Sequence, residues 1–268
     1  MSDITPIIEL DNVRVTYTSR TGKLFSPNKI HAVDGVSLRL MPGETIGIVG
    51  ESGCGKSTTA NVMCGLRAPT SGRVFFKGLE VTKRTAADRR QIGRVVSVVF
   101  QDPATALNAR MIVRDQLMDP LLVHKIGTKE SREKRVRDLI AMVGLPDSAL
   151  EALPGQLSGG QRQRVAIARA LSIGPDAIIA DEPTSALDVS VRAQILNLLT
   201  DLKDELGLSM VFISHDIQTV RYVSDRIVVM NGGKIVEEGP AQRILEAPTN
   251  DYTRTLLGAA PSLLHPAI

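Results

Sequence analysis

One loop of the chain has the residue types needed to bind nucleotide phosphates. It consists of Gly50-Glu51-Ser52-Gly53-Cys54-Gly55-Lys56-Ser57, which fits the pattern G-x-x-x-x-G-K-[ST]. In this pattern the glycines let backbone amides wrap around the phosphates, the lysine reaches the outer phosphates and the final hydroxyl holds Mg²⁺. The sequence therefore predicts a phosphate site that includes residues 50–58, ending at Thr58, with Ser57 as a metal ligand.

Two adjacent carboxylates, Asp181 and Glu182, follow the apolar run 177–180. Phosphoryl transfer depends on positioning and charge neutralisation, and an acidic residue at a strand end can hold the metal, as we expect of Asp181. Glu182 lies just past the strand end, where a carboxylate can orient and deprotonate an attacking water. Such a run of Asp, Glu and Pro can also be only a helix cap or turn, but the phosphate loop upstream favours catalysis.

These residues need strands that end beside the chemistry. The apolar segment 45–49 leads directly into the phosphate loop, and residues 58–66 have helical character. The segment 95–100 predicts a buried strand. The uniformly apolar segments 177–180 and 210–213 are typical of strands covered on both faces by helices, so they predict a mostly parallel sheet. The predicted fold class is α/β, with a P-loop nucleotide-binding core.

Two other regions flank or interrupt this core. Apolar residues with a period of two at 8–15 and 36–40 predict an N-terminal antiparallel β subdomain with a long hairpin loop over 19–28. Apolar residues at helical spacing predict a helical subdomain inserted into the core. We expect a single domain over 1–268, with the core at 1–101 and 158–240, the helical subdomain at about 102–157 and a C-terminal tail at 241–268.

The composition limits the possible partners. The 268 residues include 32 Lys and Arg and 29 Asp and Glu, and the net charge of +3 is too small to indicate a nucleic-acid surface. No apolar run approaches the roughly 20 residues that span a bilayer, so a transport role would need separate membrane subunits. Two cysteines and the lack of a secretory signal indicate the cytoplasm. We interpret one basic cluster as the solvated face of a helix. It consists of Lys83, Arg84, Arg89, Arg90 and Arg94.

A second glycine-rich stretch completes an ordered set of motifs. It consists of Leu157-Ser158-Gly159-Gly160-Gln161, and Ala180-Asp181-Glu182 and then His215 follow it. Together with the phosphate loop, these motifs make almost the whole chain resemble the ATP-binding subunits of ABC transporters. The resemblance implies ATP hydrolysis with ATP and Mg²⁺ as cofactors. It also implies catalytic roles for Glu182, His215, Gln101 and Lys56.

The resemblance gives roles to three residues outside these loops. Gln101 matches the Q-loop glutamine, which in the family senses metal and water, so it joins Ser57 and Asp181 as an expected Mg²⁺ ligand. His215 matches the switch histidine that contacts the γ-phosphate, although a lone histidine is more often structural or exposed. Tyr17 matches the aromatic residue that stacks on adenine; without the resemblance it would be a strand aromatic packed into the core.

The stretch 157–161 matches the ABC signature motif and opens a predicted helix. Helix amino ends attract anions, so Ser158, Gly159, Gly160 and Gln161 are expected to touch a γ-phosphate, although a simple loop-to-helix joint is the alternative. In the family the signature closes over the nucleotide of a partner, so two cassettes must sandwich two nucleotides. The D-loop that crosses this interface is matched by Ser185-Ala186-Leu187-Asp188.

Within the family, three segments resemble the oligopeptide, dipeptide and nickel importer branch. They are the stretch from Gln101-Asp102-Pro103 to residues 106–110, the segment Asp119-Pro120-Leu121 and the tail 248–257. Ala109 replaces a usual proline, and Asn250-Asp251 replaces the usual His-Pro. The resemblance implies uptake of peptides or a related small solute by a peripheral protein on the cytoplasmic face of the inner membrane. The expected partners are a second ABC ATPase subunit, two integral membrane permease subunits and, indirectly, an extracytoplasmic solute-binding protein, with no nucleic acid.

An alternative function is a soluble ABC ATPase that serves a cytoplasmic enzyme assembly of the phosphonate-degrading type. Its relatives should lack the Gln-Asp-Pro to Asn-x-Arg pattern of residues 101–110. ABC ATPases of DNA repair are disfavoured, because they insert long heptad-rich coiled coils where this chain has only a short helical segment.

Overall fold

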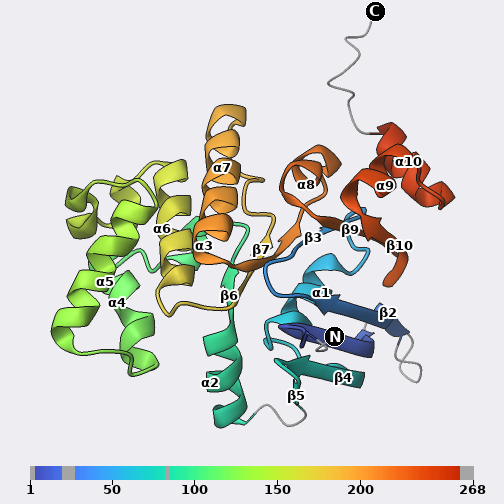
Figure 1. Ribbon diagram of the computed structural model, residues 1–268, viewed down its shortest axis with the longest axis horizontal. Coiled ribbons are helices and arrows are strands. Elements are labelled where there is room, and N and C mark those ends of the chain that lie inside the picture. Colours follow the sequence, from blue (N-terminus) through green and yellow to red (C-terminus); the bar gives the residue numbers. More distant parts are fainter. Residues whose placement is uncertain (1–3, 20–27, 82–84, 260–268) are drawn as a thin grey trace, which may run out of the picture. The chain divides into compact units, whose positions relative to one another are not determined.

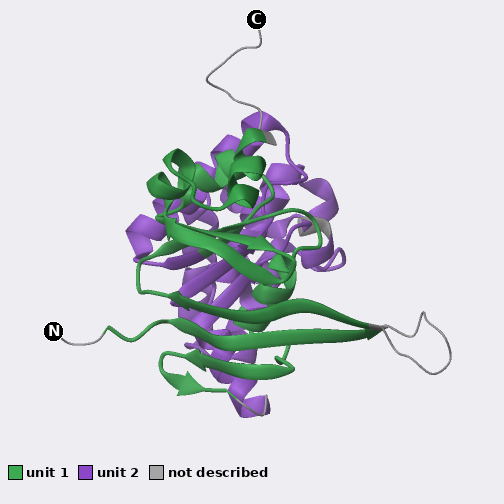
Figure 2. Cartoon of the chain, turned by 90° about the vertical axis from the view of Figure 1, so that its right-hand side faces the viewer, with its two compact units in different colours: residues 1–82, 211–268 green, residues 83–210 purple. Residues whose placement is uncertain are grey.

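The computed structural model describes residues 4–19, 28–81 and 85–259 of the chain. The chain divides into two compact units, which Figure 2 colours separately. The first unit comprises residues 1–82 and 211–268, and the second comprises residues 83–210. The phosphate loop lies in the first unit, and the carboxylate pair and the signature stretch lie in the second.

An antiparallel sheet in the first unit has the order β2-β1-β4-β5 (Figure 1) and contains β1 (Ile8–Ser19), β2 (Asn28–Leu40), β4 (Ser71–Phe76) and β5 (Leu79–Glu80). Its buried residues on β1 are Ile8 and Leu10, then Val13 and Val15, so the period of two is interrupted once. A register shift against β2 lies between Leu10 and Val13, where Asn12 has φ 49°. This bulge adds a residue and thereby returns the apolar side chains to the buried face.

A strand and a helix of the first unit hold the two ends of the phosphate loop. β3 (Thr45–Val49) is buried throughout and ends at the loop, and α1 (Lys56–Met63) begins directly after it. β3 pairs in parallel with β9 (Arg226–Asn231), and β9 pairs antiparallel with β10 (Lys234–Pro240). β8 (Ser209–Ile213) ends beside β3, because the amide of Ser214 donates to the carbonyl of Ile48 at 3.2 Å.

Three more helices belong to the first unit. α8 (Ile217–Val223) packs against β3, and α9 (Ala241–Glu246) and α10 (Asp251–Ala259) pack against β10. The predicted C-terminal tail, 241–268, was assigned no secondary structure, and α9 and α10 form within it. They bring the C-terminal segment close to the strands around the phosphate loop.

The second unit contains a parallel pair of strands. β6 (Val96–Val99) runs beside β7 (Ala177–Asp181), from Val96 opposite Ala177 to Val99 opposite Ala180. Three helices accompany them: α2 (Ala86–Val95) and α6 (Gly159–Leu171) pack on β6, and α7 (Val189–Leu206) packs on α6. Covered strands of this kind explain the uniformly apolar runs in the sequence.

The connection between β6 and α6 is helical. It contains α3 (Pro103–Ala106), α4 (Val113–Val123), α5 (Lys129–Met142) and the short 3-10 helices η1 (Asp147–Glu151) and η2 (Pro154–Gln156). α4 and α5 lie side by side (Figure 1) and pack on each other and on α6. Their buried side chains include Leu117, Leu121, Leu139 and Ile140. These residues have the spacing that predicted the helical subdomain, and that part of the predicted fold is confirmed.

The predicted fold class is confirmed, because antiparallel strands, mostly parallel strands and inserted helices are all present. The helix after the phosphate loop starts at Lys56, two residues earlier than expected. Arg89, Arg90 and Arg94 are exposed on α2, as a solvated helix face requires, whereas Lys83 and Arg84 lie outside the described residues. The central part of the predicted hairpin loop, residues 20–27, also lies outside them.

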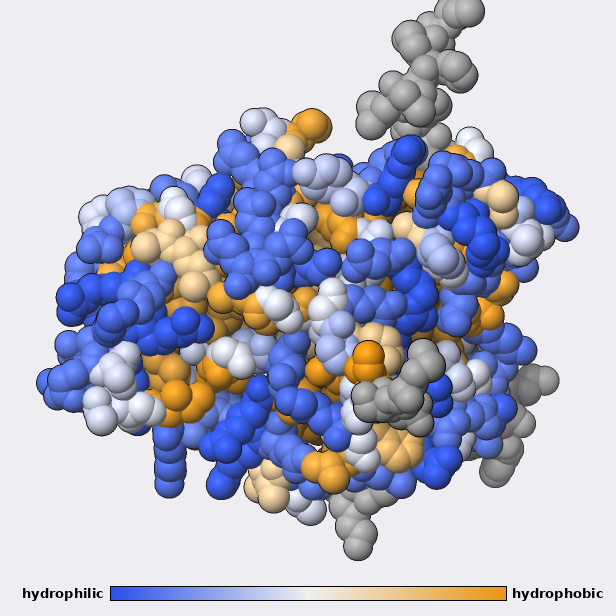
Figure 3. Space-filling view, in the orientation of Figure 1, coloured by the Kyte–Doolittle hydropathy of each residue, from blue (hydrophilic) through white to orange (hydrophobic). Residues whose placement is uncertain are grey.

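The face drawn in Figure 3 is largely hydrophilic, with apolar residues gathered in small separate groups. Within the described part of the chain, no helix combines the length and the apolar character needed to span a bilayer.

Candidate active site

The phosphate loop follows β3 and makes a close turn at its first residue. Gly50 has φ 151°, and a Cβ atom there would lie 2.2 Å from the carbonyl oxygen of Met230 on β9. Only glycine fits this conformation and this approach of two backbones. The pattern glycine at position 50 is therefore required by the path of the chain between β3 and α1.

Lys56 points back into its own loop. Its Nζ atom donates to the carbonyl of Gly50 at 2.7 Å and to the carbonyl of Glu51 at 2.9 Å, and it lies 3.9 Å from Sγ of Cys54. The residue is 6% exposed, so its charge relies on these carbonyl dipoles. The sulfur is the weakest of the three partners and the one that a phosphate oxygen would replace at least cost.

The remaining residues of the loop divide by exposure. Ser52, Gly53 and Ser57 are exposed, Thr58 is half-buried, and Cys54 and Gly55 are buried. Ser57 is the second residue of α1, where the amino end of the helix favours negative charge. The loop therefore exposes Ser52, Gly53 and Ser57 to solvent beside the buried Lys56.

Tyr17 lies on β1 in the same unit and is 37% exposed. The guanidinium carbon of Arg67 lies over its ring, 4.2 Å from the centroid. A cation over one face is an attractive contact, and it fixes the orientation of a ring that the fold leaves partly open. The tyrosine is consequently not a fully buried core residue.

His215 lies between the end of β8 and the start of α8. It is exposed, whereas Ser214 before it is buried. The hydroxyl of Ser214 accepts from the amide of Asp216 at 3.0 Å, and the Asp216 carboxylate caps α8 by accepting from the amide of Gln218 at 2.9 Å. These two bonds fix the backbone on either side of the histidine.

The second unit brings two predicted catalytic residues into contact. Nε2 of Gln101, just after β6, donates to Oε2 of Glu182 at 3.2 Å. Asp181 is the last residue of β7, and Glu182 follows it with φ 48°. A non-glycine residue in this conformation costs about 1–3 kcal/mol and is held by its surroundings. Here the amide and hydroxyl of Ser185 both donate to the carbonyl of Glu182, at 3.2 Å and 3.1 Å.

The signature stretch forms the amino end of α6. The hydroxyl of Ser158 accepts from the amide of Gln161 at 3.3 Å, and the Gln161 side chain accepts from the amide of Ser158 at 2.8 Å. This reciprocal pair is a capping box, which fixes where the helix begins. Gly159 and Gly160 then form the first residues of the helix.

The D-loop packs against these glycines within the second unit. A Cβ atom on Gly160 would lie 2.6 Å from Cγ1 of Val191, and one on Gly159 would lie 3.6 Å from Cδ2 of Leu187. Asp188 caps α7, because its Oδ1 atom accepts from the amide of Val191 at 2.9 Å. Ser185 and Ala186 precede these residues in the turn after β7, and Ala186 is exposed.

The predicted site residues thus form two groups. The first unit carries Tyr17, the loop 50–58 and His215, and the second carries Gln101, Asp181, Glu182, the signature stretch and the D-loop. Across residues 4–19, 28–81 and 85–259, no three His, Cys, Asp or Glu side chains gather as metal ligands. The hydroxyl of Ser57, in the first unit, and the carboxylate of Asp181, in the second, are each the kind of hard oxygen donor that Mg²⁺ binds.

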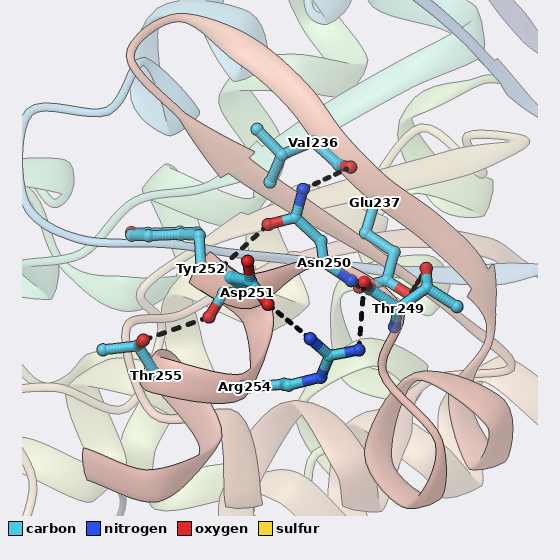
Figure 4. A network of polar contacts seen from close by, with 8 residues as sticks. All are labelled: Val236, Glu237, Thr249, Asn250, Asp251, Tyr252, Arg254 and Thr255. Carbon is cyan, nitrogen blue, oxygen red and sulfur yellow. Dashed lines mark hydrogen bonds and ion pairs between the residues drawn. The ribbon is translucent and has the colours of Figure 1, made fainter.

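Sequence reasoning missed a polar network in the C-terminal segment (Figure 4). Glu237 on β10 has a side chain that is only 4% exposed. It accepts from the amide and hydroxyl of Thr249 at 2.9 Å and 2.8 Å and from the amide of Asn250 at 3.1 Å. Burial would raise the pKa of Glu237, but these hydrogen bonds outweigh it and lower the pKa to about 2.

The same network continues to the phosphate loop. Asn250 accepts from the amide of Tyr252 at 2.9 Å through Oδ1 and donates to the carbonyl of Val236 at 3.4 Å. The hydroxyl of Tyr252 accepts from the amide of Glu51 at 3.1 Å. No local sequence pattern marks Glu237 as buried, because a glutamate is usually solvent-exposed.

Comparison with known proteins gives results consistent with these motifs. The family model described as ABC transporter matches residues 33–185. The dipeptide transport ATP-binding protein DppF of Haemophilus influenzae is 44% identical over 97% of this chain and 79% of its own. The oligopeptide transport ATP-binding protein AppF of Bacillus subtilis is 44% identical over 95% of this chain and 78% of its own.

A solved structure also matches. The ATP-binding cassette MJ0796, in a dimeric post-hydrolysis state bound to ADP and Pi, superposes with a TM-score of 0.77 and 33% identity. The match covers 87% of this chain and 98% of that one.

Proposed function

The chain belongs to the ABC transporter family, and from this premise we propose that it is the ATP-hydrolysing subunit of an importer of peptides or related small solutes. One observation carries the peptide assignment: 44% identity to a dipeptide transport ATP-binding protein, over nearly the whole of this chain. The relatives described above are peptide transport proteins, which favours this function over the soluble ATPase of a phosphonate-degrading assembly.

Glu182 is the proposed general base. Its backbone conformation places the carboxylate just past the end of β7, and the hydrogen bond from Gln101 orients it. A carboxylate in hydrogen-bonding reach of a water can accept its proton as that water attacks the γ-phosphate. In this proposal His215 donates a hydrogen bond to the γ-phosphate, and Gln101 helps to position the water.

Phosphate binding is assigned to residues 50–58 and adenine stacking to Tyr17. Lys56 turns from Cys54 toward the outer phosphates, while its two carbonyl bonds keep the loop around it. A magnesium ion, when bound, would neutralise phosphate charge, and Ser57, Asp181 and Gln101 are its proposed protein ligands. The partly exposed ring of Tyr17, steadied by Arg67, offers an apolar face to the base.

The signature residues are proposed to complete the site of a second ATPase subunit. The amino end of α6 is capped by Ser158 and Gln161, and its first two residues have no side chains to obstruct a phosphate. The D-loop contacts this end within the same unit, so the two motifs would move together across a dimer interface. The dimer would bind two integral membrane permease subunits at the cytoplasmic face of the membrane and be supplied by an extracytoplasmic solute-binding protein.

Two measurements test this proposal. The mass of the Glu182→Gln protein, measured by light scattering, should double when Mg·ATP is added if one sequence can build both sites. A protein that binds ATP and stays monomeric would instead require a different partner ATPase. Affinity purification from membranes should recover a polytopic membrane protein with the wild-type chain, and recovery with soluble enzymes alone would reject a role in transport.

A further inference from the structure

We propose that Tyr252 is a positioning residue of the phosphate loop. Thr249 and Asn250, bound to Glu237, hold Tyr252 in place. The inference rests on the proposed role of residues 50–58 in phosphate binding. The chain thereby connects a tail distant in sequence to the loop that receives ATP. Tyr252 need not touch the nucleotide; it acts through the backbone of Glu51.

One peptide group of the loop is held from both of its sides. The carbonyl of Gly50 accepts from Nζ of Lys56 at 2.7 Å, and the amide of Glu51 donates to the hydroxyl of Tyr252 at 3.1 Å. These two polar groups belong to the same planar peptide unit. Hydrogen bonds at the two opposite edges of this peptide plane restrict its rotation. Without them the plane could turn easily, because Gly50 is the most freely rotating residue type.

The orientation of this peptide matters for phosphate binding. The loop binds phosphate with backbone amides, whose directions are set by the peptide planes that precede them. Lys56 serves both the loop carbonyls and the phosphates, because its ammonium has three protons to share. Tyr252 takes the amide of Glu51, so in this proposal the phosphates are bound by the other amides of the loop.

Tyr252 is itself held in place by a chain of contacts. Its amide donates to Oδ1 of Asn250 at 2.9 Å, and the amide of Asn250 donates to the buried carboxylate of Glu237 at 3.1 Å. Thr249 adds two more hydrogen bonds to Glu237. This arrangement anchors the first turn of α10 to β10 (Figure 4).

The phenol is suited to this contact at neutral pH. Burial raises the pKa of Tyr252, so the ring keeps its proton and presents a neutral oxygen to the amide of Glu51. Phenylalanine at this position would keep the ring and remove only that oxygen. Tyr252→Phe is therefore the substitution that isolates the contact.

The test measures dissociation constants for ATP and ADP, by calorimetry on the full chain, together with the melting temperature without nucleotide. Tyr252→Phe should weaken the binding of both nucleotides about three-fold, because the loop is then less ordered before binding, and it should lower the melting temperature by no more than the loss of one hydrogen bond explains. Tyr222→Phe on α8 is the matched control, because it removes the same atom from a residue that is 62% exposed in the same unit. It should bind both nucleotides like the wild type.

A double-mutant cycle with Glu237→Gln tests the anchoring chain. If Glu237 acts through Tyr252, adding Glu237→Gln to Tyr252→Phe should weaken ATP binding no further than the larger single effect. Wild-type dissociation constants for Tyr252→Phe, with or without a lower melting temperature, would overturn the inference and leave the ATPase function standing. A wild-type chain that binds neither nucleotide would overturn the phosphate-loop function, and the inference with it.

Discussion

Nε2 of Gln101 donates to Oε2 of Glu182 at 3.2 Å. The glutamine follows β6 and the glutamate follows β7, and these strands are parallel neighbours, so both side chains start from the same edge of the strand pair. Gln101 also precedes the helical connection that begins with α3. The contact therefore joins the proposed general base to the start of the inserted helices.

This pair predicts a pH effect for Gln101→Glu. Two carboxyl groups about 3 Å apart resist simultaneous ionisation, so one of them would retain a proton at a pH where a single carboxylate is ionised. The acidic limb of the pH dependence of kcat/KM should move to higher pH. Gln101→Ala is the control, because it removes the hydrogen bond without adding a charge and should move that limb less than Gln101→Glu does. Identical limbs for both variants would show that the two side chains do not meet in the working enzyme.

The signature glycines differ in their tolerance of a methyl group. Gly160→Ala should lower the free energy of unfolding by about 1–2 kcal/mol, because overpacking against Val191 exceeds the gain in helix propensity. Gly159→Ala meets Leu187 at an ordinary contact distance of 3.6 Å and should leave the unfolding free energy unchanged. Denaturant titration of the two variants measures the difference. Equal stability would mean that Val191 does not pack there.

Gly159→Ala should nevertheless impair ATP-induced dimerisation if the signature closes over a partner's nucleotide. A methyl group at the amino end of α6 would stand between the backbone amides and the phosphate. Light scattering of Gly159→Ala combined with Glu182→Gln measures this effect against Glu182→Gln alone. Full dimerisation of the double variant would exclude a close approach of phosphate at that residue.

The low pKa of Glu237 predicts that the C-terminal segment is destabilised by acid. Its pKa in the folded chain, about 2, lies below the ordinary value of 4.5, so folding favours the ionised form. The stabilisation is complete above that ordinary pKa, and it is lost as the pH falls from about 4.5 toward 2. Glu237→Gln should cost about 1–3 kcal/mol at neutral pH, because an amide group then faces backbone donors.

The control for that substitution is the neighbouring Glu238→Gln. Glu238 has a side chain that is 47% exposed and a 3.8 Å ion pair with Arg226, so its loss should cost less than about 1 kcal/mol. Urea unfolding at about pH 7 and about pH 3, the latter inside the range where the stabilisation is lost, measures both variants. If the Glu237→Gln protein loses as much stability between these two pH values as the wild type, the carboxylate is not the acid-sensitive group.

The sequence predicted the elements that follow regular patterns. Mostly apolar segments indicated β3, β6 and β7, and the spacing of Leu117, Leu121, Leu139 and Ile140 indicated the helical insert. The site residues around Lys56 and Glu182 could be named because each motif lies at a strand end. For these strands, helices and motif residues, the periodicity and local spacing of the sequence were sufficient for the prediction.

The C-terminal network could not be predicted in the same way. Its bonds join residues far apart in the sequence, such as Glu51 and Tyr252, and hydrogen bonds of this kind leave no periodic pattern. Glu237 is an acidic residue in a strand, where a charge is usually solvent-exposed, and only the tertiary structure shows that Thr249 and Asn250 surround it. In the sequence, the bulge at Asn12 appears only as a break in the alternation of apolar and polar residues; the register shift that defines it is seen in the structure.

The rate of phosphate release by Glu182→Gln at saturating Mg·ATP tests the central claim most directly. The amide keeps the shape of the side chain and its place beside Gln101 but cannot accept a proton from water, so turnover should fall on the order of 10²-fold or more. The dissociation constant for ATP should stay at the wild-type value. Wild-type turnover by this variant would contradict the account, because hydrolysis would then proceed without the residue assigned as its base.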